Sequence, residues 1–222
     1  MVERTVSHAS ITGLSELETS KVLRNTYLLL SITLAFSALT AWVSVAMGVT
    51  LMNPWIFLIG IFGLSYLVNK TADSALGLVM VFLFTGFLGF YVGPVISLYS
   101  AMPGGSSAVV SALGLTAVVF LGLSGYALMT KKDFSFMTGF LTVGLIALFA
   151  VVMLSWFMDL SAFMGAIGAA VVLLMSGLIL WQTSAIIHGG ETNYILATVT
   201  LYVSLYNIFV NLLMIFDMGG DD

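Results

Sequence analysis

The sequence predicts an all-α membrane protein, a bundle of seven transmembrane helices, and three observations support this fold class. Of its 222 residues, 60% are hydrophobic and only 7% are charged, whereas soluble domains carry about 25% charged residues. The apolar residues gather in seven runs, and no Asp, Glu, Lys, Arg or His lies deep inside a run. All six Lys and Arg residues fall on alternate sides of these runs. Lipid, rather than water, is therefore the expected solvent.

The seven runs are the expected transmembrane spans, because crossing the hydrocarbon core takes about 20 residues in a helix. They are too long and too weakly alternating for barrel strands, which need about 10 residues each. The second span is the shortest, and its ends are the least sharply marked. In chain order the spans cover residues 26–47, 54–68, 75–98, 109–129, 136–158, 162–187 and 194–216.

Turn residues mark several ends of these spans. Asn53-Pro54 and the Met-Pro-Gly-Gly segment at 102–105 predict turns before the second and fourth spans. Two glycines predict the end of the sixth span, and Asn193 is expected to cap the seventh by accepting from its first-turn N–H groups. The sixth and seventh spans should therefore form a tight antiparallel hairpin. Its motif consists of His188, Gly189, Gly190, Glu191 and Asn193.

The basic residues predict the orientation, because cytosolic loops of helical membrane proteins are rich in Lys and Arg. They precede the first span, separate the second from the third, and separate the fourth from the fifth. Seven crossings then place the N-terminus in the cytosol and the C-terminus in the periplasm. The residues are Arg4, Lys21, Arg24, Lys70, Lys131 and Lys132.

Three regions follow from this reading of the chain. Residues 1–20 are polar and are expected to be a mobile cytosolic tail. Residues 21–218 form the seven-helix domain, and residues 219–222 form a short acidic periplasmic tail. Ser15 and Glu18 have the spacing of a capping box, which predicts a helix start near Ser15 that leads into the first span. A chance match is the alternative, because the motif is short.

Small residues indicate where helices approach closely, because membrane helices associate through van der Waals contact. Gly86, Gly89 and Gly93 share one face of the third span. Packing is the expected role of this face, with a hinge or a backbone-lined cavity as the alternative, and Gly93-Pro94 predicts a kink. A second small-residue surface is expected in the fourth span. It comprises Gly114, Gly122 and Gly125.

A polar stripe follows one face of the seventh span, at spacings of four, three and four residues. Buried polar groups in lipid need partners, so the stripe should face inward and meet the end of the sixth span. One interpretation is hydrogen bonding between helices, and the other is a hydrated vestibule or ion path. The stripe is Thr200, Ser204, Asn207 and Asn211, and its expected neighbours are Gln182, Thr183 and Ser184.

Catalysis finds little support in the sequence. Gly122-Leu123-Ser124-Gly125 matches the GxSG pattern of rhomboid-type intramembrane proteases, with His188 as the candidate base. A serine nucleophile needs such a base within hydrogen-bonding reach, whereas His188 is expected at the interface and Ser124 about 10 Å deeper. The chain has no cysteine and no metal-binding motif. We therefore predict no catalytic residue, metal ligand or cofactor.

Four stretches together resemble the Bax-inhibitor family, most closely its bacterial YccA-like branch. They are residues 21–27 (KVLRNTY), 85–94 (TGFLGFYVGP), 187–195 (IHGGETNYI) and 201–209 (LYVSLYNIF). The similarity runs from about residue 21 to 215. It implies a seven-helix fold with the last helix central, in the bacterial inner membrane. It also implies binding to the membrane protease FtsH through the tail and the membrane helices, and modulation of its activity.

Other members of the family imply a different activity, a calcium leak that a pair of aspartates gates with pH. At the matching positions this chain has Gln182 and Ser204. These side chains form hydrogen bonds but do not titrate near neutral pH, and they lack the charge that attracts calcium. The aspartate gate is therefore not expected here. A weak cation leak lined by the polar stripe stays open as an alternative.

Overall fold

The structure is a computed structural model, and it describes residues 2–51 and 53–218. Within these residues every regular element is helical, and no strand is present. The all-α fold class is therefore confirmed. The long helices are α1 (Val2–Ala46), α2 (Pro54–Thr71), α3 (Ala75–Ser100), α4 (Gly105–Thr130), α5 (Thr138–Leu154), α6 (Met164–Ile187) and α7 (Tyr194–Met218), and two short 3-10 helices are η1 (Ser135–Met137) and η2 (Ser161–Phe163).

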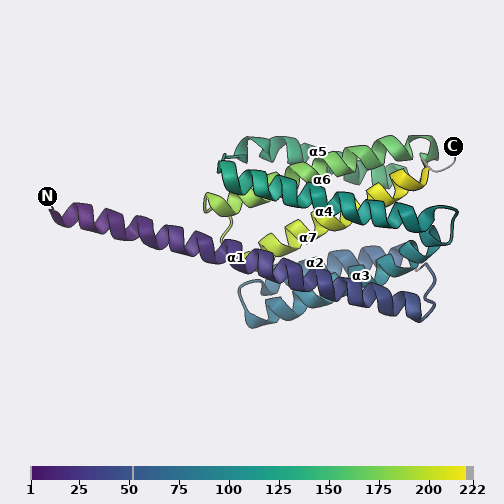
Figure 1. Ribbon diagram of the computed structural model, residues 1–222, viewed down its shortest axis with the longest axis horizontal. Helices are drawn as coiled ribbons and strands as arrows, with labels where there is room; N and C mark the ends of the chain where they lie inside the picture. The colour runs from purple at the N-terminus through teal and green to yellow at the C-terminus, as the bar shows by residue number, and fades with distance from the viewer. Residues whose placement is uncertain (1, 52, 219–222) are drawn as a thin grey trace.

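Six helices of the described chain are long and apolar enough to cross a membrane, namely α1 and α3 to α7. The second helix, α2, is not among them. Its 18 residues extend about 27 Å at 1.5 Å per residue, close to the roughly 30 Å of a hydrocarbon core. It packs against α3, and the two lie side by side in Figure 1. A seventh crossing by α2 stays a prediction.

The first helix is much longer than the bundle is thick. Its 45 residues form one continuous helix, and the N-terminal part projects well beyond the other helices (Figure 1). A helix start near Ser15 is therefore wrong, because the backbone is already helical from Val2. The mobility of residues 1–20 stays a prediction. The expected acidic tail at 219–222 lies outside the described residues.

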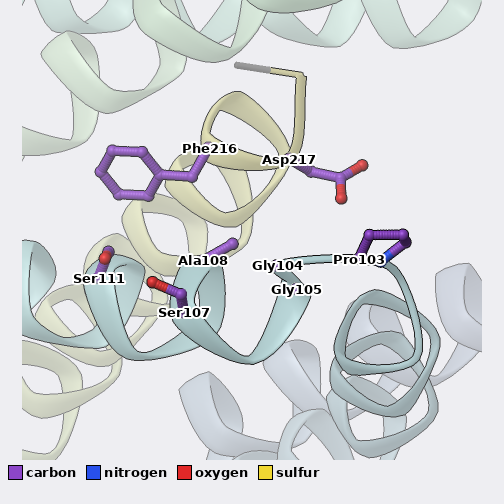
Figure 2. A pocket seen from close by; sticks show the side chains of 8 residues that line it. All are labelled: Pro103, Gly104, Gly105, Ser107, Ala108, Ser111, Phe216 and Asp217. Atoms are coloured by element: carbon purple, nitrogen blue, oxygen red, sulfur yellow. The ribbon is translucent and has the colours of Figure 1, made fainter. Parts of the chain in front are cut away.

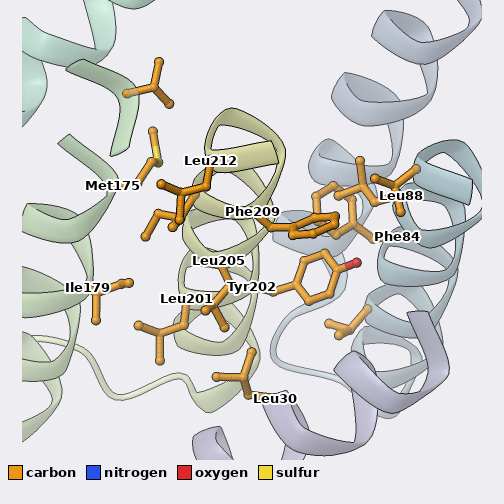
Figure 3. Packing of buried hydrophobic residues seen from close by; sticks show 14 of the residues in the cluster. Leu30, Phe84, Leu88, Met175, Ile179, Leu201, Tyr202, Leu205, Phe209 and Leu212 are labelled. Atoms are coloured by element: carbon orange, nitrogen blue, oxygen red, sulfur yellow. The ribbon is translucent and has the colours of Figure 1, made fainter. Parts of the chain in front are cut away.

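The last helix occupies the centre of the bundle. It packs against α1, α3, α4 and α6, and Figure 3 shows its side chains pointing to both sides. On one side Leu201 and Leu212 face Ile179 and Met175 of α6. On the other side, Tyr202 and Phe209 point toward side chains of α3. This is the central position expected from the family resemblance.

The glycine face of α3 lies against α1. A Cβ atom at Gly93 would come within 2.6 Å of the Ala41 carbonyl oxygen, and one at Gly89 would overlap the backbone of Ser37. At Gly86 the neighbour is the ring of Phe36. The two helices thus touch backbone to backbone, which only glycine permits. Pro94 is buried one residue further, inside a helix that continues to Ser100.

The small-residue surface expected on α4 has no such neighbour. A Cβ atom at Gly114, Gly122 or Gly125 would meet nothing within 4 Å, so the expected packing does not occur within the described chain. The packed side of α4 instead carries residues such as Ala112 and Thr116. In a membrane, lipid can cover a small-residue face as well as a helix can. Glycine spacing alone therefore did not identify the buried side.

Candidate functional site

The polar stripe of α7 lies in the bundle but bonds mainly to its own helix. Thr200, Ser204, Asn207 and Asn211 each donate to the carbonyl oxygen four residues earlier, at 2.8 to 3.1 Å. Ser204 is fully buried, and the other three are half-buried. Within the described residues, no hydrogen bond joins the stripe to Gln182, Thr183 or Ser184. The interhelical bonds expected of the stripe are therefore not formed.

The three polar residues near the end of α6 have separate environments. Thr183 shares a hydrogen bond of 3.2 Å with the Tyr27 hydroxyl of α1. Ser184 accepts from the Phe134 N–H at 2.9 Å and donates to the Lys132 carbonyl oxygen at 3.1 Å. Gln182 is only 2% exposed, and its Nε2 has no partner in the protein. Two of these side chains therefore tie α6 to other elements, and the third is left unsatisfied.

A buried tyrosine makes the polar contact that sequence reasoning missed. The Tyr202 hydroxyl of α7 donates to the Thr85 carbonyl oxygen of α3 at 3.2 Å and shares a hydrogen bond with Ser37 Oγ of α1. A second link joins Thr198 Oγ1 to the Thr26 carbonyl oxygen at 3.2 Å. These bonds join three helices in the core. Sequence reasoning could not pair these groups, because the Ser37 hydroxyl and the Thr85 carbonyl oxygen both lie more than 100 residues from Tyr202.

The α6–α7 hairpin has the turn that its glycines predict. Gly189 adopts a left-handed conformation with φ of 73°, which glycine accepts without strain. The N–H groups of Gly190 and Glu191 both donate to the Ala185 carbonyl oxygen, at 2.8 and 3.1 Å. His188 Nδ1 lies 2.9 Å from the carbonyl oxygen of Ser184. The turn itself thus satisfies carbonyl groups in the last turn of α6.

Asn193 caps α7, as its position predicts, and also joins two turns. Its Oδ1 accepts from the N–H groups of Ile195 and Leu196, at 2.9 and 3.2 Å. Its Nδ2 donates to the Asp73 carboxylate at 2.8 Å and to the Ala72 carbonyl oxygen at 3.1 Å. One amide therefore starts the central helix and fastens it to the α2–α3 turn. Glu191 supports this arrangement by accepting from the Asn193 N–H at 2.8 Å.

The α4–α5 loop lies at the same end of the bundle and is held against α6. Just after the loop, Thr138 at the start of α5 accepts through its Oγ1 from Trp181 Nε1 of α6 at 2.8 Å. Within the loop, the Ser135 N–H donates to the Asp133 carboxylate at 2.8 Å. This bond lowers the pKa of the Asp133 carboxyl below its ordinary value, because it stabilises the ionised form. The charged residues Lys131, Lys132 and Asp133 are exposed at this surface.

The structure separates the two residues of the rhomboid-like alternative. Ser124 is 3% exposed, and its Oγ has no hydrogen-bond partner. His188 is exposed at the end of α6 and contacts Ser184 instead. No nucleophile–base pair is therefore assembled from these residues. Among the described residues, no group of three or more His, Cys, Asp or Glu side chains could hold a metal ion.

Two of the hollows on the described surface have linings that do not include the polar stripe. The first, of about 280 Å³, lies where the end of α7 meets the start of α4, opposite the hairpin end (Figure 2). Phe216 and Asp217 lie over Ser107 and Ser111 there. The second is an apolar groove of about 470 Å³, lined by Phe36, Thr40, Leu64, Val79, Phe82, Leu83, Gly86 and Phe87.

The fold and its central helix define a class, the multi-pass α-helical membrane protein whose last helix packs among α1, α3, α4 and α6. The family model described as "Inhibitor of apoptosis-promoting Bax1" matches residues 19–221. The chain therefore belongs to the Bax-inhibitor family. The match begins just before the bundle and leaves out the start of α1.

Bacterial relatives cover nearly the whole chain. It is 48% identical over 208 residues to the Escherichia coli K12 protein named "Modulator of FtsH protease YccA", with 94% of each chain covered. An uncharacterized protein of Pseudomonas aeruginosa is 52% identical over 206 residues, 92% of this chain and 93% of its own. A membrane protein of Vibrio cholerae is 44% identical over 200 residues, 90% of each. The chain is a multi-pass protein of the bacterial inner membrane, and its family points to regulation rather than catalysis.

Proposed function

We propose that this protein binds the membrane protease FtsH and modulates its proteolysis, without catalytic activity of its own. The observation that carries this proposal is the 48% identity to a protein named as a modulator of FtsH, over 94% of both chains. Such identity over nearly the whole length supports a shared partner as well as a shared fold. The absence of an assembled nucleophile–base pair at Ser124 and His188 is consistent with a regulatory role.

The projecting part of α1 is the proposed contact outside the membrane. It extends beyond the bundle in Figure 1. If the N-terminus is cytosolic, as the positive residues predict, this part of α1 lies in the cytosol. A segment that stands clear of the bundle is accessible to a large partner from all sides. The transmembrane helices would supply the second contact, within the bilayer.

Deletion of residues 2–20 tests the proposed contact. We expect the truncated protein to co-purify with FtsH at a much lower yield and to lose its effect on the turnover of a membrane substrate. The matched control keeps the length and composition of the segment but scrambles its order. Circular dichroism and the unfolding midpoint of the truncated protein would show whether the bundle is intact.

The outcomes distinguish the role of the tail in FtsH binding from that of the transmembrane bundle. Loss with the deletion but not with the scramble would show that a projecting chain suffices, whereas loss with both would show that its sequence is read. Normal co-purification and normal turnover in the truncated protein would contradict a tail-dependent mechanism. Absence of co-purification in the full-length protein would overturn the proposed function itself.

The cation-leak alternative is less well supported by the structure. The stripe amides of Asn207 and Asn211 are bonded to their own backbone, and neither surface hollow is lined by the stripe. Calcium flux into liposomes distinguishes the alternatives. We expect no flux above that of protein-free liposomes at pH 6 or pH 8. Flux that ignores pH would indicate a neutral pore, and flux that follows pH would require a titratable group other than an aspartate pair.

A further inference from the structure

Three of the buried polar atoms that have no hydrogen-bond partner in the protein come from α1, α4 and α6. They are Thr26 Oγ1 of α1, Ser124 Oγ of α4 and Gln182 Nε2 of α6. Their residues are 0%, 3% and 2% exposed, respectively. An unsatisfied polar group costs free energy in any protein interior, and more in a membrane, where no bulk water reaches it. Three such groups indicate that something satisfies them.

The contacts of Tyr27 place these three residues at one level of the bundle. Its hydroxyl bonds to Thr183, the neighbour of Gln182, and its ring lies 5.9 Å from that of Phe120. Ser124 lies about one helical turn beyond Phe120. Thr26 precedes Tyr27 directly and bonds through its carbonyl oxygen to Thr198 of α7. The residues next to the three orphaned atoms therefore meet where α1, α4 and α6 pack around α7.

The chemistry of the three groups selects a small neutral ligand. Gln182 offers N–H donors, while the hydroxyls of Thr26 and Ser124 both donate and accept. None of the three carries a charge, and an unpaired N–H donor repels a cation. A buried water makes about three hydrogen bonds to groups of this kind. We propose that Thr26, Ser124 and Gln182 form an internal water-binding site, the junction site, where α1, α4 and α6 meet α7.

A fourth orphaned atom provides a contrast. Ser44 Oγ also lacks a partner, but it lies at the tight α1–α3 contact, where a Cβ atom at Gly93 would be 3.0 Å from it. The close backbone contact of α1 and α3 there favours a dry environment for this hydroxyl. Ser44 is therefore an unsatisfied hydroxyl of a dry contact, and it serves as the control for the junction site.

Hydroxyl radicals generated by X-rays in ¹⁸O-labelled water test the site, because they oxidise side chains next to bound water. The full-length protein in lipid nanodiscs would be exposed, and oxidation would be located by mass spectrometry. We expect Leu30 and Ile179, one turn from Thr26 and Gln182, to be oxidised at least threefold faster than Leu88 and Ile208. All four side chains are at most 1% exposed, so access to bulk solvent does not explain a difference.

Variants connect the labelling to the three residues. In Gln182→Met combined with Ser124→Ala, the oxidation of Leu30 and Ile179 should fall to the level of Leu88 and Ile208. Ser44→Ala should leave it unchanged. If the double variant does not fold, Thr26→Val alone provides the same comparison.

Two results would overturn the proposal. One is wild-type oxidation of Leu30 and Ile179 at the rate of Leu88 and Ile208. The other is a clear rise in the unfolding midpoint of Gln182→Met. If the site is dry, an apolar side chain of similar length removes an unsatisfied N–H donor and stabilises the protein. If a water is bound there, the same change removes one of its hydrogen-bond partners. FtsH binding is not involved in either measurement, so failure here leaves the proposed function standing.

Discussion

Single polar side chains determine how the turns at the hairpin end are joined. Asn193 combines the cap of α7 with two bonds to the α2–α3 turn. Its capping role follows from sequence alone, because Asn before an apolar run is a common helix start. Its bonds to Ala72 and Asp73 do not follow, because about 120 residues separate the partners. The residue that local sequence preference selects as the helix cap thus also makes a tertiary contact.

Replacing Asn193 should weaken both roles together. We expect Asn193→Ala to lower the free energy of unfolding by about 1 to 2 kcal/mol, the upper range for loss of a cap. An SDS titration of the protein in mixed micelles measures the change. Asn69→Ala is the matched control, because Asn69 is exposed and donates only to the Ser65 carbonyl oxygen of its own helix; there the loss should stay within about 0.5 kcal/mol. Equal losses in the two variants would contradict the linking role.

At the scale of helices, glycine faces that look alike in the sequence have different surroundings. The face of α3 with Gly89 lies on the backbone of α1, whereas the face of α4 with Gly122 meets nothing within 4 Å. Spacing predicts a face but not its neighbour. Which face is covered depends on how the helices are arranged around α7, and that arrangement comes from contacts between distant segments.

The two glycines give a direct test of this difference. We expect Gly89→Ala to destabilise the bundle by about 1 to 3 kcal/mol, because its methyl group must push α1 away. Gly122→Ala should cause no loss and could gain up to about 1 kcal/mol, since alanine favours the helix over glycine. The same SDS titration reports both. Destabilisation by Gly122→Ala comparable to that by Gly89→Ala would show that the open face of α4 is packed in solution, for example by a second copy of the chain.

At the scale of the whole molecule, the orientation and the crossing by α2 follow from charge and length rather than from packing. The positive residues predict a cytosolic N-terminus. If α2 crosses, Thr50 before it and Ser74 after it lie on opposite sides of the membrane. Both residues are exposed, and the chain contains no cysteine. Single cysteines can therefore be introduced without removing natural ones.

Ser106 is exposed at the start of α4, on the side of the membrane predicted for Thr50. We expect Thr50→Cys and Ser106→Cys to react with a membrane-impermeant maleimide on cells with a permeabilised outer membrane. Ser74→Cys should react only after the inner membrane is also opened, because it would face the cytosol. Labelling is read as a mass shift on a gel. Reaction of Thr50→Cys and Ser74→Cys under the same conditions would show that α2 does not cross, and reaction of Ser74→Cys alone would reverse the orientation.

The sequence by itself determined the class of the molecule, because each relevant signal is local. Too few charges for a soluble surface, apolar runs of membrane length and glycine or asparagine at their ends need no knowledge of distant residues. These signals located the helices, the hairpin turn and the cap at Asn193. The neutrality of Gln182 and Ser204 also follows from the sequence alone, since neither side chain carries a charge wherever it lies.

Only the tertiary structure decided which polar groups meet. The stripe of α7 turned to its own backbone, because a carbonyl oxygen four residues earlier is always within reach in a helix. Tyr202 instead became the link between α1, α3 and α7, and Gln182 was left without a protein partner. Hydrogen bonding depends on distances of a few ångströms between helices, and residue spacing along one helix carries no information about them.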